Sequence, residues 1–508
     1  MQRLTGLDGA FLALESPTTH LHILGAMVFD PADAPGGLSF RKIRRRVAER
    51  VPLVPPLRMR MVEVPFGLRH AALVEDPHFD LDFHVRRRGL PGPGGREEFT
   101  ELVADIASRP LDRHRPLWEF HVVEGLEHGY VGLVSKVHHA IIDGVSGAEV
   151  LAAFLDASPD PTPWPLFGVD RDRRETRAPV DRSGAKAQTP GAESAGPQWA
   201  PPALPGDLAQ VRQALGALPG QVEAAARSIA RTVRTARTLA SRNRELPGPP
   251  PPAPFEAPRT SINRSISPHR RVAVADLPLA DIRRIGEVLG GTTNDVVLAV
   301  AAGALRTFFS GREEEPERSL VALVPVSVRA EEEAGALGNR VSGMLVSLAT
   351  SVSDPIARLG RIREGMASAK DQNRDVDPGV FSSWAETTLP AVATRASRLV
   401  TNLRLFDRLA PLCNLIVSNV PGPDVPLYLA GARLVSLHPL GPIVEGVGVN
   451  VTVFSYCETV HVGLQGCWDL VPDIDVLARA MEESLAELLD VARRKARPVP
   501  WWHDELPA

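Results

Sequence analysis

The 508-residue sequence is poor in cysteine and has neither a long apolar run nor an excess of basic charge. Its three cysteines, Cys413, Cys457 and Cys467, follow no CxxC or Cys/His spacing, so neither a zinc-binding motif nor a disulfide framework is expected. An odd cysteine count in so long a chain is typical of a reducing compartment. The formal net charge of −4 gives no overall basic field that would attract nucleic acid.

Two further absences concern the membrane. The first ten residues are polar and mixed, unlike the apolar segment of a secretory signal. No stretch of about 18 consecutive apolar residues occurs, so a transmembrane helix is not expected. The sequence therefore predicts a cytoplasmic protein. If its substrate is a lipid, the protein must meet that substrate peripherally, at the inner membrane face or at a lipid-droplet surface.

The hydrophobic patterning predicts two mixed α/β units joined by a linker. Residues 1–157 alternate helix and strand patterns, and residues 261–497 do so again. Between them, residues 158–260 are rich in proline, which favours extended, solvated chain over a packed core. Residues 498–508 form a short tail. The fold class is therefore α/β with two domains and a crossover linker.

One helix is predicted inside the linker, over about residues 206–243. Its apolar residues follow helical spacing, and arginines fall on the opposite side. Two interpretations stay open. The helix either packs on the protein with its arginines in solvent, or lies on a lipid surface with its arginines against anionic head groups.

Outside the linker, the clearest elements are read from periodicity. Helices are predicted over residues 38–51, 99–108, 293–307 and 474–494. Strands are predicted over residues 71–73, 81–85, 118–124, 131–137, 320–326, 340–349, 415–419, 448–456 and 459–465.

The sharpest chemical signal is the run Val137-His138-His139-Ala140-Ile141-Ile142-Asp143-Gly144. A strand is predicted to end at its first residue, and a capping-box pattern predicts a helix from Ser146. The histidines therefore lie on a tight connection, where side chains are both accessible and held. A neutral imidazole can take a proton from a hydroxyl, and the carboxylate of Asp143 can organise the loop by pairing with donors. We assign the chemistry to His139 and a structural role to His138, although spacing alone does not decide between them.

The same run of residues also allows purely structural interpretations. The two histidines can be hydrogen-bonded core residues, and Asp143-Gly144 can be a simple turn. A metal site would use both histidines and Asp143, but no further His or Cys stands at convincing spacing, so no metal is expected. Other chemistries lack their motifs: no GxSxG elbow, no Walker A sequence and no GxGxxG after a strand is present. Direct transfer with a general base, and without an acyl-enzyme, is the simplest scheme that remains.

His138-His139 through Asp143-Gly144 resembles the HHxxxDG signature of coenzyme A-dependent acyltransferases and peptide-synthetase condensation domains. Flanking blocks make the chain similar to the bacterial wax ester synthase/diacylglycerol acyltransferase family, across nearly its whole length except the linker. These blocks are residues 7–12 with 15–19, 79–85, 110–112 leading to 116–118, 267–271, 293–297, 324–329, 338–339, 418–423 and 450–466.

The resemblance implies two chloramphenicol acetyltransferase-like domains with a tunnel between them and His139 near its middle. It implies His139 as the proton acceptor, and Asp143 with Gly144 as organisers of the loop. It also implies substrate-binding residues in two further family blocks. Pro116 and Trp118 match the first of these blocks. Asn294 and Asp295 match another, placed near the tunnel, although Thr293 or Asn294 would also serve as a helix N-cap.

The activity implied is transfer of a long acyl group from acyl-CoA to diacylglycerol, making triacylglycerol, or to a fatty alcohol, making a wax ester. Acyl-CoA is then a substrate, and no cofactor is needed. Two alternatives stay open. One is a condensation-type acyltransferase acting on carrier-bound or amine acceptors, and the other is a catalytically inactive lipid-binding protein.

Overall fold

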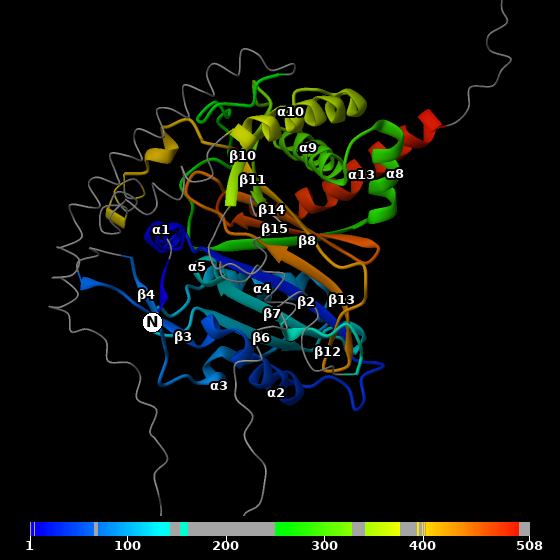
Figure 1. Ribbon diagram of the computed structural model, residues 1–508. Helices are drawn as coiled ribbons and strands as arrows, with labels where there is room; N and C mark the ends of the chain where they lie inside the picture. The colour runs from blue at the N-terminus through cyan, green and yellow to red at the C-terminus, as the bar shows by residue number, and fades with distance from the viewer. Residues whose placement is uncertain are drawn as a thin grey trace, which may run out of the picture.

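The computed structural model describes residues 2–4, 6–65, 70–142, 153–160, 249–327, 341–375, 394–395, 399, 401 and 403–496. Most of the linker, the predicted helix over residues 206–243 and the tail lie outside these ranges, as does the helix predicted to start at Ser146. The described part forms two six-stranded sheets with helices around them (Figure 1).

The first sheet has the strand order β12-β13-β2-β7-β6-β5. Its strands β7 and β6 fall where the sequence predicts them, and every residue of β7 is buried, as expected of a strand covered on both faces. The bounds are β2 (His22–Asp30), β5 (Val85–Gly89), β6 (Trp118–Glu124), β7 (Val131–His138), β12 (Tyr428–Leu429) and β13 (Ala432–Leu440).

The second sheet has the order β10-β9-β11-β14-β15-β8, with helices packed on one face (Figure 1). Helix α9 is buried from Asp295 through Leu305, because its own small and aliphatic side chains make it apolar on all sides. The bounds are β8 (Arg270–Pro278), β9 (Val321–Ser327), β10 (Val341–Ser347), β11 (Leu415–Pro421), β14 (Val449–Tyr456), β15 (Thr459–Cys467), α8 (Leu279–Leu289), α9 (Thr293–Gly311), α10 (Pro355–Asp375) and α13 (Ile474–Ala496).

Smaller elements complete the N-terminal half. Helix α4 packs with Phe99 and Val103 against both sheets, reaching Val272 of β8. A three-stranded sheet has the order β1-β4-β3. The bounds are β1 (Gln2–Arg3), β3 (Met59–Val62), β4 (Ala72–Glu75), α1 (Gly6–Leu14), α2 (Phe40–Arg50), α3 (Leu81–His84), α4 (Arg96–Ser108) and α5 (His139–Ile142), with short 3-10 turns at Val51–Leu53, Pro55–Arg58, Glu127–Gly129 and Leu405–Asp407.

The two sheets share chain segments. β12 and β13 come from the C-terminal half, yet β13 pairs with β2 along most of that strand. At the crossing of β13 and β15, a Cβ built on Gly463 would lie 1.8 Å from the carbonyl oxygen of Pro439. Only glycine permits this approach. Residues 261–497 are therefore not one sheet: they build the second sheet and also complete the first.

One predicted strand is wrong. Residues 81–84 form the helical turn α3, and only Val85 begins a strand. Asp80 caps that turn by accepting a hydrogen bond from the Asp82 N–H at 2.9 Å. His84 then turns inward, where its Nδ1 lies 2.7 Å from the Trp118 carbonyl oxygen. The cap and the buried histidine override the alternating pattern.

No single helix among the described residues is both long and apolar enough to cross a bilayer. Taken together, α8 and α9 satisfy the length and composition criteria, but they meet at a bend of 100°. Since α9 is buried in the core, its apolar composition is explained by packing against α13, α10 and the second sheet.

Candidate active site

The two adjacent histidines of the signature lie where β7 ends and α5 begins. The strand end is held on both sides: the His138 N–H donates to the Leu117 carbonyl at 3.0 Å, and the His139 N–H donates to the Leu21 carbonyl at 2.9 Å. His22 of β2 lies directly opposite His138 in the sheet register. The chain then turns into the four-residue helix α5, so the two neighbouring side chains point into different surroundings.

His138 is buried, with 1% of its surface exposed. Its Nδ1 accepts a hydrogen bond from the Ala140 N–H at 3.0 Å, which places the proton of the neutral ring on Nε2. That Nε2 lies 3.7 Å from a carboxylate oxygen of Glu15. Burial lowers the pKa of His138 to about 3, against a smaller opposing effect of Glu15. His138 therefore stays neutral and holds the turn that presents the next residue.

His139 is only partly buried. Its ring lies against Phe11 of α1, with ring centroids 4.2 Å apart. Burial lowers its pKa, while the charge of Asp8 on the same helix acts in the opposite direction. Within the described part of the chain, its Nδ1 has no hydrogen-bond partner. That nitrogen is itself buried. His139 is thus a neutral imidazole at ordinary pH, which is the form that a general base requires.

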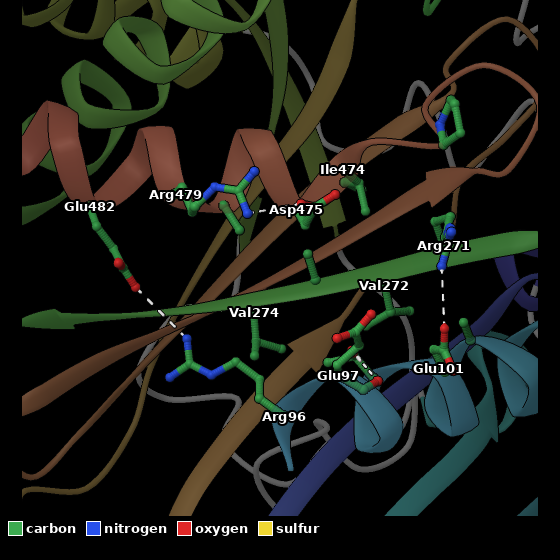
Figure 2. A pocket seen from close by; sticks show the side chains of 15 residues that line it. Arg96, Glu97, Glu101, Arg271, Val272, Val274, Ile474, Asp475, Arg479 and Glu482 are labelled. Atoms are coloured by element: carbon green, nitrogen blue, oxygen red, sulfur yellow. Dashed lines mark hydrogen bonds and ion pairs between the residues drawn. The ribbon is translucent and has the colours of Figure 1, made fainter.

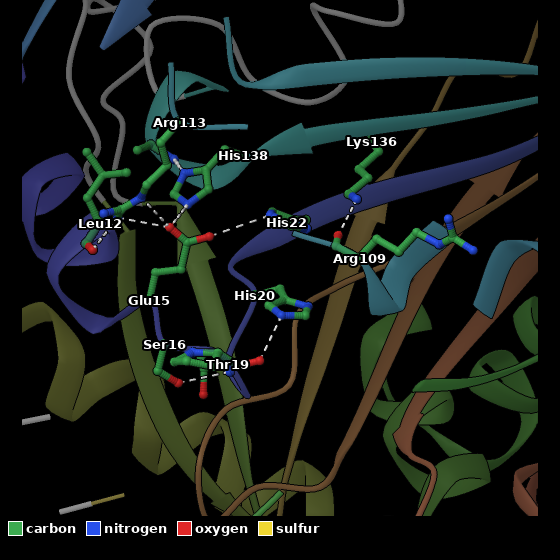
Figure 3. A network of polar contacts seen from close by, with 12 residues as sticks. Leu12, Glu15, Ser16, Thr19, His20, His22, Arg109, Arg113, Lys136 and His138 are labelled. Carbon is green, nitrogen blue, oxygen red and sulfur yellow. Dashed lines mark hydrogen bonds and ion pairs between the residues drawn. The ribbon is translucent and has the colours of Figure 1, made fainter. Parts of the chain in front are cut away.

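A half-buried carboxylate, that of Glu15, organises the surroundings of His138 (Figure 3). Glu15 Oε2 accepts from Arg113 Nε at 2.9 Å, and Glu15 Oε1 lies 3.7 Å from Nε2 of His22. Arg113 also donates to the Leu12 carbonyl at 2.8 Å. The sequence pattern did not bring these residues together, because they come from four separate segments. Glu15 appears there only within a family block, and Arg113 and His22 carry no local signal.

Pro116 and Trp118 lie in the connection to β6, next to the strand that carries the histidines. Pro116 is buried, and its carbonyl accepts from the Trp118 N–H at 2.9 Å. The Trp118 ring is fully buried, stacks on His84 at 4.6 Å, and donates its indole N–H to the Leu57 carbonyl at 2.8 Å. In this structure both residues support the sheet, and direct contact with substrate stays a prediction.

Asn294 and Asp295 begin α9 in the other half of the chain. The N-cap is Thr292, one residue before Thr293 and two before Asn294, the expected positions. Asp295 Oδ2 accepts from the Thr292 N–H at 2.8 Å, and Thr292 Oγ1 accepts from the Asp295 N–H at 3.3 Å. Asn294 is half-buried, and its side-chain oxygen accepts from Asn419 Nδ2 of β11 at 3.2 Å. Asp295 Oδ2 therefore serves helix capping, whereas Asp295 Oδ1 is buried without a partner among the described residues.

Asp143 and Gly144 lie outside the described residues, so their predicted roles remain predictions. The described residues do contain one group with metal-binding side chains elsewhere. Asp276 of β8 accepts at Oδ1 from His438 Nε2 at 2.9 Å and from His461 Nδ1 at 2.7 Å. A metal on His461 Nδ1 would move the proton to Nε2, which is buried without a partner in the described part. The group is better explained as a hydrogen-bonded clamp between the two sheets.

A pocket of about 400 Å³ opens between α4, β8 and α13 (Figure 2). Its floor is apolar, with Val272 and Val274, while charged side chains of both signs line its rim. Arg96 there lies 3.9 Å from Glu482, and Arg271 lies 3.9 Å from Glu101. None of the predicted site residues lines this pocket, so it is separate from His139.

Comparison with known families now identifies the scaffold. Residues 4–297 match the model of the wax ester synthase/diacylglycerol acyltransferase catalytic domain, and residues 337–489 match that of the C-terminal domain of the same family. The chain belongs to the wax ester synthase/diacylglycerol acyltransferase family. Its fold is accordingly the two-domain fold of coenzyme A-dependent acyltransferases, as the resemblance of the sequence implied.

Individual relatives agree with this family. Two proteins of Mycobacterium tuberculosis, provisionally named diacylglycerol O-acyltransferases, are 34% and 36% identical to the chain. The alignments cover 96% and 98% of this chain and 90% and 99% of theirs. The solved wax ester synthase/diacylglycerol acyltransferase from Marinobacter aquaeolei VT8 is 29% identical, with a TM-score of 0.65 over 97% of this chain and 100% of that one. The first condensation domain of the calcium-dependent antibiotic synthetase, at 17% identity and a TM-score of 0.52, shares the fold over 100% of this chain and 99% of that one.

Proposed function

We propose that this family member transfers a long acyl group from acyl-CoA to the hydroxyl of diacylglycerol, and also of fatty alcohols, with His139 as the general base. The observation that carries the proposal is the state of His139 at the end of β7. Its imidazole is partly accessible, it is held neutral by burial, and one of its nitrogens has no partner within the described residues. The family membership supplies the reaction class.

The reaction proceeds in one transfer. A ring nitrogen of His139 takes the hydroxyl proton as the acceptor oxygen attacks the thioester carbon, and a tetrahedral oxyanion forms. The carbon–sulfur bond then breaks. The proton on the imidazole passes to the departing sulfur, so that ester, coenzyme A and neutral His139 are left. No acyl-enzyme is required, which agrees with the absence of a GxSxG elbow.

The lowered pKa of His139 suits this role. A general base acts in its deprotonated form, and burial keeps the ring in that form at neutral pH and below. His138 and Glu15 act as positioning residues: the first fixes the turn through Ala140, and the second ties that turn to α1 and Arg113. Asp143 and Gly144 are proposed to organise the loop after α5.

Substrate contacts are proposed around Asn294, since its side chain is half-buried and reaches β11 at the start of a core helix. Asp295, Trp118 and Pro116 are proposed to line the same substrate-binding region, although Asp295 Oδ2, the Trp118 indole N–H and the Pro116 carbonyl are hydrogen-bonded within the protein. The tunnel between the domains is part of the same proposal. No cofactor takes part in the scheme. The protein is proposed to work in the cytoplasm, in peripheral contact with a membrane or lipid-droplet surface.

The test is a thiol-release assay with purified protein and palmitoyl-CoA, with dioleoylglycerol and hexadecanol offered in parallel. Release that requires an acceptor, together with the matching ester on thin-layer chromatography, is the expected result. Its dependence on His139 is tested with His139→Ala in the same assay. Palmitoyl-CoA binding without any ester from either acceptor would reject catalysis in favour of lipid binding. Transfer only to amines or carrier-bound acceptors would favour a condensation-type activity.

A further inference from the structure

Several leucines with largely exposed side chains lie in one short stretch of the C-terminal half. Their exposed fractions are 58% for Leu399, 53% for Leu403, 52% for Leu409 and 41% for Leu412. We call these four residues the leucine patch. Most leucines of the two cores have less than a tenth of their surface exposed, so this concentration is unusual. Exposed apolar residues gathered in one place mark a surface that another apolar surface covers.

The charges around the leucine patch are mainly basic. Arg264, Arg404 and Arg408 are exposed, and none of them has an ion-pair partner within the residues that the structure describes. The nearby acid, Asp407, has a carboxylate oxygen that accepts from the Ser265 N–H at 2.7 Å. Leucines interleaved with unpaired arginines complement a surface that is apolar inside and negatively charged outside. An anionic lipid layer has this chemistry.

The turn at the centre of the leucine patch is fixed by contacts with the rest of the protein. Leu405–Asp407 form a 3-10 turn, which the Asp407–Ser265 bond fastens to the chain before β8. Phe406 points inward onto Gly446, so closely that a Cβ there would lie 2.7 Å from its ring. These two contacts fix the turn that lies between Leu403 and Leu409.

Neighbouring contacts connect the leucine patch to helix α1, which packs against His139. Glu445, beside Gly446, accepts from the Thr18 hydroxyl at 2.6 Å. Thr18 follows α1, whose Phe11 lies against the ring of His139. The last residue of α1, Leu14, is itself 51% exposed. In Figure 1 the gold segment around residue 405 lies on the same side of the molecule as α1.

We propose that the leucine patch, with Arg264, Arg404 and Arg408, docks the protein onto an anionic lipid surface and so brings the His139 site to acceptors dissolved in that surface. This inference rests on the proposed function, since diacylglycerol and long-chain alcohols partition into lipid. It assigns the docking to the leucine patch and its three arginines rather than to the predicted linker helix over residues 206–243. A protein partner on the same residues is the competing occupant.

The first test uses the full-length protein and two variants of the leucine patch. Leu403→Ser/Leu409→Ser/Leu412→Ser removes apolar area, and Arg404→Glu/Arg408→Glu reverses charge. The matched control is Leu53→Ser/Ile356→Ser, two residues of 41% and 38% exposure elsewhere. Binding is measured by co-sedimentation with phosphatidylcholine vesicles, with and without phosphatidylserine. We expect each patch variant to bind the anionic vesicles about tenfold or more weaker, and the control to bind like the wild type.

The second test separates docking from chemistry. Turnover is measured with dioleoylglycerol in the same vesicles and with a water-soluble short-chain alcohol. The patch variants should lose about tenfold of the vesicle activity and keep that on the soluble alcohol. A protein lacking residues 206–243 should still bind. Vesicle binding equal to wild type in the triple variant, or no vesicle binding by the wild type, would overturn the proposal in favour of a protein partner. Equal loss on both acceptors would overturn it too, whereas failure of the proposed function alone would leave vesicle binding intact.

Discussion

The inner ends of β2 and β7 and the core around α9 are both buried, but they bury opposite kinds of side chain. Around the first lie His20, His22, Lys136 and His138, with burial lowering the pKa of each. The α9 core instead buries aliphatic and aromatic residues, among them Val296, Leu298 and Phe309 of the helix itself. Buried ionisable groups oppose folding unless their partners compensate. The N-terminal sheet therefore gives up stability at the place where the chemistry is proposed, and the α9 core supplies it.

The largest difference between the two regions is expected when each of the two adjacent histidines is replaced separately. His139→Asn should reduce turnover about 10²- to 10⁴-fold, because the general base is lost, with little change in melting temperature for a partly exposed residue. In His138→Asn, the amide oxygen can still accept from the Ala140 N–H, so most activity should remain. Steady-state rates and thermal unfolding of both variants decide. Equal loss in both would show that the assignment to His139 alone is wrong.

The α9 core should respond in the opposite way. Leu298 is fully buried, so Leu298→Ala should lower the free energy of unfolding by about 2–5 kcal/mol. Turnover per folded molecule, measured well below the melting temperature, should stay within about twofold of wild type. Ile356→Ala, at a 38% exposed position of α10, is the control and should cost under about 0.5 kcal/mol. A turnover loss exceeding the loss of folded protein would mean that this core also shapes the site.

Low pH should destabilise the region of β2 and β7 more than the α9 core, because the buried histidines lie in the former. Burial lowers the pKa of His20 to about 4 and that of His138 to about 3, so below about pH 6.5 the unfolded chain binds more protons than the folded one. Stability is therefore lost as pH falls, by about 1 kcal/mol per pH unit for each fully buried histidine. Amide exchange, corrected for intrinsic rate, should accelerate more in β2 and β7 than in α9 between pH 7.5 and 5.5. Equal acceleration would mean that both regions open as one unit.

The smallest effect concerns the clamp between the sheets. Burial raises the pKa of Asp276, but the hydrogen bonds and charges of His438 and His461 together outweigh burial and leave this pKa well below the ordinary Asp value. Asp276→Asn should cost about 1 kcal/mol at pH 7, since the carboxylate is partly exposed. The stabilisation that comes with a lowered pKa is complete above the ordinary Asp pKa and is lost gradually as pH falls below it. The difference in stability between Asp276→Asn and wild type should therefore shrink as pH falls below about 4. Urea unfolding of both proteins at pH 7 and below about pH 4 measures this difference. A difference that stays constant would exclude the charge of Asp276 as its cause.

Strong periodicity allowed much of the fold to be predicted. β6, β7, α9 and α13 begin within about two residues of the expected positions, because each combines a long apolar pattern with clear ends. The histidine pair was also evident, since its signature is local. Residues 81–84 were predicted wrongly because one capped turn and one buried histidine outweigh a short alternating pattern.

The features that could not be predicted from the sequence depend on contacts between residues that lie far apart in the chain. Glu15, His22, Arg113 and His138 meet only in the folded chain, as do Asp276, His438 and His461. The exchange of β13 into the first sheet has no local signature, because its pattern suits either sheet. Such pairings are chosen by the packing of the whole molecule.

The pairing of β13 with β2 also constrains how the protein is made. During synthesis, β2 emerges roughly 400 residues before its partner, which at ribosomal rates of about 5–20 residues per second is roughly 20–80 s. Throughout that interval, one edge of β2 presents unpaired backbone N–H and C=O groups. The nascent N-terminal half is thus exposed to aggregation and to chaperones until residue 440 has left the ribosome. A fragment that ends before β13 should not yield a stable first sheet.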